Sequence, residues 1–87
     1  MGEHILAHSI VLVSSDGTTF RADTWGERRE DGTWWGWLEF SPREGGDVLV
    51  TGQETSQPNR DALAYWATGL EPVYLEGALL RARDVVE

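Results

Sequence analysis

Two Asp-Gly pairs, Asp16-Gly17 and Asp31-Gly32, constrain the fold of this chain more than any other feature. Each pair lies between segments in which apolar and polar residues alternate, and Asp-Gly is a preferred sequence for the two-residue loop of a β-hairpin. The flanking segments, residues 5–14, 19–29 and 33–41, are therefore expected to form three consecutive antiparallel strands. A looser, glycine-containing turn at residues 42–47 leads to a predicted fourth strand at 48–55.

In the second half of the chain, the spacing of the apolar residues changes from that of a strand to that of a helix. The apolar residues of segment 58–69 follow the i, i+3, i+4, i+7 spacing of a helix with one buried side, namely Leu63, Trp66, Ala67 and Leu70. This segment is predicted to be helical, with Ser56 or Gln57 as its N-cap and Gly69 near its end. Residues 73–83 are extended in character and predict a last strand, although residues 78–83 alone also fit a helical turn.

These elements predict one α+β domain spanning residues 1–87, built from a four-stranded antiparallel meander, one α-helix and a fifth strand. A chain of this length buries only about 60–65% of its unfolded surface and forms a single core. A last strand that returns after a helix is able to close on the first strand, which removes exposed edges. The strand order resembles that of SH3-like barrels, and the resemblance implies a small, partly open barrel.

Fifteen acidic residues against seven arginines give the chain a net charge of −8. This charge repels phosphate groups, so nucleic acids and membranes are not expected as partners. The chain contains no cysteine, which fits a reducing compartment, and its start lacks the basic and apolar stretches of a signal peptide. We therefore expect a cytoplasmic protein. Arginine without any lysine fits either GC-rich codon usage or selection for interface contacts.

The third predicted strand carries three tryptophans within four positions. Alternation divides its side chains between two apolar faces, one with Trp35, Trp37 and Glu39 and the other with Trp34, Leu38 and Phe40. Two-residue loops predict four cross-strand pairs, namely Val13 with Phe20, Val11 with Ala22, Arg28 with Trp35, and Gly26 with Trp37. Both faces of this strand thus need a cover, either from the protein itself or from a partner.

The predicted register creates a conflict on the face of Trp34, Leu38 and Phe40. Trp25 shares this face, but so do three charged residues of the second strand, Arg21, Asp23 and Glu27. A fully buried layer does not accept such charges unless they are paired. Either a bulge near Gly26 or Gly36 shifts the register by one residue, or the face is half exposed and is covered in part by the helix or by a second copy.

The aromatic residues and their neighbours are the first candidates for a ligand or interface site, namely Trp25, Trp34, Trp35, Trp37, Leu38, Glu39 and Phe40. On an exposed face, Trp35, Trp37 and Glu39 form an aromatic platform beside a carboxylate, which suits a sugar or a proline-rich peptide. The alternative is a structural role. In that case Trp37 covers Gly26 and Trp35 stacks on Arg28.

The polar segment before the predicted helix supplies a second group of candidates, Glu54, Gln57, Asn59 and Arg60. Helix capping explains most of them, and a small polar ligand at the helix N-terminus is the alternative. On a strand, His4 and His8 lie about 13 Å apart, too far for one metal ion, which leaves only a site shared across a symmetric dimer. No cofactor, metal or catalytic group is expected.

The sequence therefore favours a small non-enzymatic domain that works through protein contacts, including self-association through the conflicted face or an edge strand. The alternative is a module that binds a small ligand, a saccharide or a peptide through the tryptophan strand or the 54–61 segment. A third hypothesis is an acidic protein that mimics the charge of a nucleic acid and blocks a DNA- or RNA-binding partner.

Overall fold

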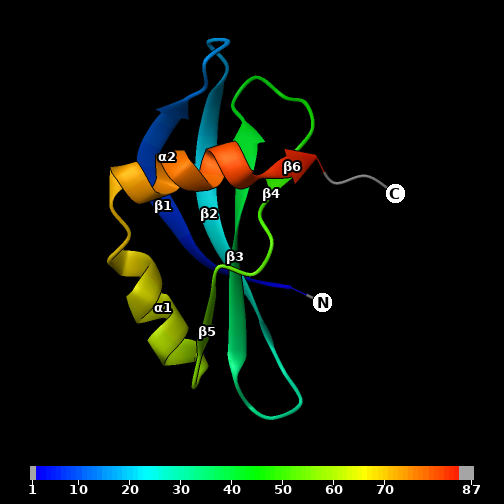
Figure 1. The fold of residues 1–87 in the computed structure, drawn as a ribbon, viewed down its shortest axis with the longest axis vertical. Coiled ribbons are helices and arrows are strands. Elements are labelled where there is room, and N and C mark those ends of the chain that lie inside the picture. Colours follow the sequence, from blue (N-terminus) through cyan, green and yellow to red (C-terminus); the bar gives the residue numbers. More distant parts are fainter. Residues whose placement is uncertain (1, 85–87) are drawn as a thin grey trace.

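The computed structural model describes residues 2–84 and consists of an antiparallel sheet with two helices packed on one of its faces (Figure 1). The elements are β1 (Glu3–Val13), β2 (Thr19–Arg28), β3 (Trp34–Pro42), β4 (Leu49–Val50), β5 (Thr55–Gln57), α1 (Arg60–Thr68), α2 (Pro72–Arg81) and β6 (Arg83–Asp84). The predicted α+β class is confirmed. Neither helix of the described segment is long and apolar enough to cross a membrane.

The strands follow the order β1-β2-β3-β4-β6, and β5 pairs with the first half of β3. Because β1 and β6 lie at opposite ends of this order, the expected barrel closure is not found within residues 2–84. Of the strand predicted at 48–55, only β4 and the first residue of β5 are extended, and residues 51–54 between them are not part of a strand. Thr51 accepts a hydrogen bond from the Leu38 N–H on its side-chain oxygen and donates its own N–H to the Leu38 carbonyl, both at 3.0 Å. The threonine thus hydrogen-bonds β3 where the strand pairing is interrupted.

The strand predicted at residues 73–83 is wrong, and so is the expectation of a single helix. Most of this segment is α2, and only the two residues of β6 are extended. The buried side chains Leu75, Ala78 and Leu79 have the i, i+3, i+4 spacing of a helix. Pro72 occupies the first turn, where a missing N–H breaks no helical hydrogen bond.

The helix predicted at residues 58–69 is present as α1, Arg60–Thr68. Its N-cap is Asn59, whose side-chain oxygen accepts a hydrogen bond from the Ala62 N–H at 2.8 Å. Ser56 and Gln57, the expected caps, belong to β5 instead. The helix therefore begins two residues later than the pattern indicates.

Both Asp-Gly loops contain three residues rather than two. In the first loop, the Ser14 N–H donates to the Thr18 carbonyl at 2.9 Å, and Gly17 has a φ of 88°. The second loop repeats this arrangement between Arg29 and Thr33 at 2.7 Å. A tight turn that ends in a left-handed glycine is the G1-bulge form of a hairpin loop. The left-handed position is the one for which glycine is needed.

The longer loops move each register by one residue. Leu12 rather than Val13 pairs with Phe20, and Trp25 rather than Gly26 pairs with Trp37. Since side chains alternate between faces, a shift of one residue on the second and third strands changes which residues share a face. The predicted conflict between apolar and charged residues on one face therefore results from the assumed two-residue loops and does not exist in the observed register.

The pairing of β2 with β3 is uninterrupted, and Gly26 lies directly opposite Gly36. The expected bulge is thus not in this pair; two register shifts lie in β1 instead, before Val11. The two glycines make room for α1. A Cβ at Gly26 would lie 2.4 Å from one methyl carbon of Leu63, and a Cβ at Gly36 would lie 2.6 Å from the other.

The face of the sheet that the helices cover holds the core. Its buried residues come from β1, β2, β3 and α2, namely Leu12, Phe20, Ala22, Leu38, Phe40, Leu75, Ala78 and Leu79. By alternation Trp34 lies on this covered face together with Leu38 and Phe40. Trp25 does not share their face, contrary to the prediction, because it pairs with Trp37.

Candidate functional site

The uncovered face of the sheet carries Trp25, Trp35 and Trp37, which we call the aromatic strip. Trp25 on β2 lies directly opposite Trp37 on β3, and Trp35 lies two residues before Trp37 on the same side of β3. Trp35 is 37% exposed and the other two are half-buried. Both helices pack on the opposite face of the sheet (Figure 1). The strip therefore presents a large aromatic surface outside the core.

One end of the aromatic strip is packed against the N-terminal part of β1. The His4 ring meets Trp25 edge-on, with 5.4 Å between the ring centroids, and its Nε2 lies 2.8 Å from a carboxylate oxygen of Asp23. The Gly2 backbone lies against Trp37, since a Cβ there would come within 2.8 Å of the indole ring. These contacts hold Trp25 and Trp37 in defined positions.

The other end of the strip contacts a cation of the same chain. The Arg29 guanidinium carbon lies 4.0 Å from the centroid of the Trp35 ring. Arg29 also lies 3.6 Å from a carboxylate oxygen of Glu27. The predicted stacking of Trp35 on Arg28 is therefore wrong by one residue, because the three-residue loop pairs Arg28 with Trp34.

A hollow of about 410 Å³ opens beside the strip, between β3 and the β4–β5 connection. Trp35 and Trp37 line one side of it, and Val50 and residues 51–53 line the other. Glu39 also lines the hollow, and its carboxylate accepts a hydrogen bond from the Trp37 indole N–H at 3.0 Å. The hollow is thus mainly aromatic and aliphatic, with one carboxylate held at its margin.

The structure brings part of the predicted aromatic site together. Trp35, Trp37 and Glu39 share one face, as their i, i+2, i+4 spacing predicts, and Trp25 joins them from β2. The other candidates, Trp34, Leu38 and Phe40, lie on the helix-covered face. Trp37 does not cover Gly26, because Gly26 faces Leu63 on the opposite side of the sheet.

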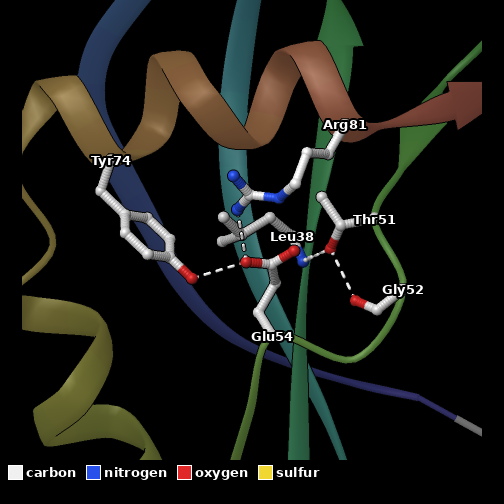
Figure 2. Close-up of polar contacts among 6 residues, drawn as sticks. All are labelled: Leu38, Thr51, Gly52, Glu54, Tyr74 and Arg81. Carbon is white, nitrogen blue, oxygen red and sulfur yellow. Dashed lines mark hydrogen bonds and ion pairs between the residues drawn. The ribbon is translucent and has the colours of Figure 1, made fainter.

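Glu54, the first of the polar candidates, is the centre of a hydrogen-bonded cluster with α2 (Figure 2). Its Oε1 accepts from the Tyr74 hydroxyl at 2.5 Å and from the Arg81 guanidinium at 2.6 Å. Burial, together with the hydrogen bond to Glu54, raises the pKa of Tyr74 to about 12. The hydrogen bond to Glu54 also raises the pKa of Arg81. The cluster ties the β4–β5 connection to the second helix.

The remaining polar candidates do not converge on a common pocket. The Gln57 amide donates to the Thr55 hydroxyl at 2.6 Å, and Asn59 caps α1. Arg60 reaches away to β1, where it donates to the Glu3 carboxylate at 2.6 Å. Gln57 and Asn59 thus make local contacts, whereas Arg60 joins α1 to β1.

The two histidines also have separate partners. His4 contacts Asp23, whereas the His8 Nε2 lies 2.7 Å from the Thr24 hydroxyl on the covered face. Burial lowers the pKa of His8, and the nearby Asp23 partly opposes this effect. Among residues 2–84, no three histidine, aspartate or glutamate side chains gather as metal ligands.

Sequence reasoning missed Arg29, Tyr74 and Arg81. Tyr74 and Arg81 are seven residues apart, the spacing that brings side chains to one side of a helix, so the signal was available once α2 was assigned as helical. The contact between Arg29 and Trp35 was predictable only with the correct loop length. No protein-family model, curated protein or solved structure matches this chain. The geometry of the open face therefore carries the functional argument.

Proposed function

We propose that this protein is a small non-enzymatic interaction module that binds protein partners through the aromatic strip. The observation that carries the proposal is the position of Trp25, Trp35 and Trp37 on the uncovered side of the sheet. Tryptophan is enriched at the centres of protein interfaces, where a large rigid ring is buried at little entropic cost. The lack of cysteine is consistent with action in the cytoplasm.

The fold itself does not need these three rings for its core. The helix-covered face already contains a buried cluster of side chains from both layers. Polar groups border the strip in fixed positions, since Asp23 is held by His4 and Glu39 by Trp37. An aromatic centre with a polar margin is the usual composition of an interaction surface.

Selection from a displayed library of random peptides tests the proposal. Peptides enriched on the wild-type protein are expected to bind a Trp35→Ser variant about tenfold more weakly, since removal of a central aromatic residue typically costs more than about 1 kcal/mol. Tyr65→Ser is the matched control, because Tyr65 is an exposed aromatic residue on α1, at 81%. Circular dichroism verifies that both variants fold. Peptides that bind the wild type and the Trp35→Ser variant equally well contradict the proposal.

Self-association is the second candidate, and β1 favours it. This strand of eleven residues forms one end of the sheet, and Val11 and Val13 near its end are exposed. An unpaired edge is able to pair with the same edge of a second copy. The mass of the protein in solution at high concentration tests this candidate.

A further inference from the structure

The hollow beside Trp35 and Trp37 is large enough to take one side chain of a partner. Side chains two residues apart on a strand are separated by about 7 Å. A side chain that enters the hollow is therefore able to contact both rings, which line the same side of it. The volume of about 410 Å³ exceeds what one side chain needs, and the hollow opens on the uncovered face of the sheet.

Trp35 already shows the chemistry of a cation site. The Arg29 guanidinium lies over its ring at 4.0 Å, the arrangement of a cation–π contact. Arg29 lines a separate recess at the β2–β3 loop and is not among the residues that line the hollow. The side of the strip that faces β4 therefore stays open to a second cation.

Charge around the hollow favours a cation as well. Glu39 is the one charged residue among the described residues that line it. A carboxylate has about four acceptor positions, so Glu39 retains acceptor capacity beyond its hydrogen bond from Trp37. The net charge of −8 adds a long-range attraction for positive groups.

On these grounds, and resting on the function proposed above, we propose that the hollow binds an arginine or lysine side chain from an extended segment of a partner protein. The side chain enters the hollow, packs against Trp35 and Trp37, and pairs its charge with Glu39. The rest of the segment lies along the strip toward Trp25. A second copy is a poor occupant of this hollow, because it brings the same negative charge, and a neutral saccharide leaves the charge of Glu39 uncompensated.

A titration followed by NMR tests the inference. The indole N–H signals of Trp35 and Trp37 are assigned with Trp35→Phe and Trp37→Phe variants. The probes are a blocked peptide Ser-Arg-Ser-Arg-Ser and the same peptide with citrulline, a neutral isostere, in place of arginine. The arginine peptide is expected to shift both signals and to bind about tenfold more tightly than the citrulline peptide, since cation–π and charge-assisted contacts are lost together.

The Glu39→Gln variant distinguishes the effect of the Glu39 carboxylate on binding from the effect of the net charge of the protein. This variant is expected to weaken binding of the arginine peptide about fivefold, since one charge-assisted contact is lost. Glu44→Gln is the matched control, because it makes the same change of charge in the exposed β3–β4 loop and is expected to alter binding less than about twofold. Equal affinities of the two peptides, or equal effects of the two variants, overturn the inference.

Two further outcomes separate this inference from the function on which it rests. If library peptides bind through the aromatic strip without containing arginine or lysine, the interaction module stands and the cation site is overturned. If chitotriose shifts the Trp35 and Trp37 signals while the arginine peptide shifts neither, the hollow is a saccharide site and the cation site is overturned; if in addition no library peptide depends on Trp35, the protein-interaction function is overturned as well.

Discussion

Glu54 is a polar side chain that joins the β4–β5 connection to α2. Its carboxylate is only 10% exposed, and it accepts hydrogen bonds from both Tyr74 and Arg81. The Tyr74 ring is also held from two sides, edge-on by Trp66 at 6.1 Å and by the Arg81 guanidinium at 5.6 Å. Removal of one member of such a cluster leaves the others imperfectly paired, which is more damaging than loss of one exposed contact.

The pKa of Tyr74 predicts a specific dependence of stability on pH. The folded protein keeps the Tyr74 proton up to about pH 12, whereas the unfolded chain loses it near pH 10.0. Because the folded form binds the proton more tightly, the contribution of Tyr74 is complete below pH 10.0 and is lost as the pH rises toward about 12. Urea unfolding of the wild type and of the Tyr74→Phe variant at several pH values measures this contribution to stability. The wild type is expected to be about 1 kcal/mol more stable near neutral pH, and this difference should disappear at high pH.

The control for this prediction is the other tyrosine. Tyr65 is exposed on α1, so Tyr65→Phe should differ from the wild type by less than about 0.5 kcal/mol at neutral pH. A difference between the wild type and Tyr74→Phe that stays constant from pH 9 to about pH 12 argues against a proton held by the folded state.

At the scale of elements, the chain's alternation and turns were sufficient to predict three strands and α1 but not their register. Two-residue and three-residue hairpin loops both favour glycine at a left-handed position, so Asp-Gly does not distinguish between them. That ambiguity of one residue decided whether Trp25 or Gly26 faces Trp37, and therefore which tryptophans are exposed. The second helix was missed because its apolar residues, Val73, Tyr74, Leu75, Leu79 and Leu80, include contiguous runs that also fit a buried strand.

The contact between α1 and the sheet predicts an unusually sensitive glycine. Gly26→Ala places a methyl group 2.4 Å from a Leu63 methyl carbon and 3.1 Å from the Trp35 carbonyl oxygen, so the helix or the strand must move. We expect a loss of about 1–3 kcal/mol in the free energy of unfolding, the usual effect of overpacking. Gly52→Ala is the control, because no atom beyond the two neighbouring residues of the chain lies within 4 Å of the added methyl group. Urea unfolding measures both.

A second substitution verifies that Leu63 causes this loss. Leu63→Ala alone is expected to destabilise the protein by about 2–5 kcal/mol, because it leaves a cavity. Combined with Gly26→Ala, the total loss should be smaller than the sum of the two, since the added methyl group occupies part of that cavity. Additive losses indicate that α1 does not pack on Gly26.

At the scale of the whole molecule, the structure is a thin two-layer domain, with extents of 40 × 31 × 18 Å. The sheet has one face covered by helices, one face exposed and an edge at β1. Two surfaces are therefore available to partners, and their requirements differ. The aromatic strip favours a cationic partner, whereas pairing along β1 depends on backbone hydrogen bonds rather than on a cationic side chain.

Pairing of two copies along β1 must overcome the repulsion between two chains of net charge −8. Added salt screens this repulsion, with a Debye length that falls from about 30 Å at 0.01 M to about 10 Å at 0.1 M. We therefore predict that sedimentation velocity detects a dimer at high micromolar concentration, and that sodium chloride strengthens the dimer rather than dissociating it. Val13→Lys introduces a charge at the exposed edge and is expected to weaken dimerisation about tenfold. Val73→Lys on α2 is the charge-matched control, since Val13 is 65% exposed and Val73 72%. A single 9.7 kDa species under all of these conditions excludes self-association.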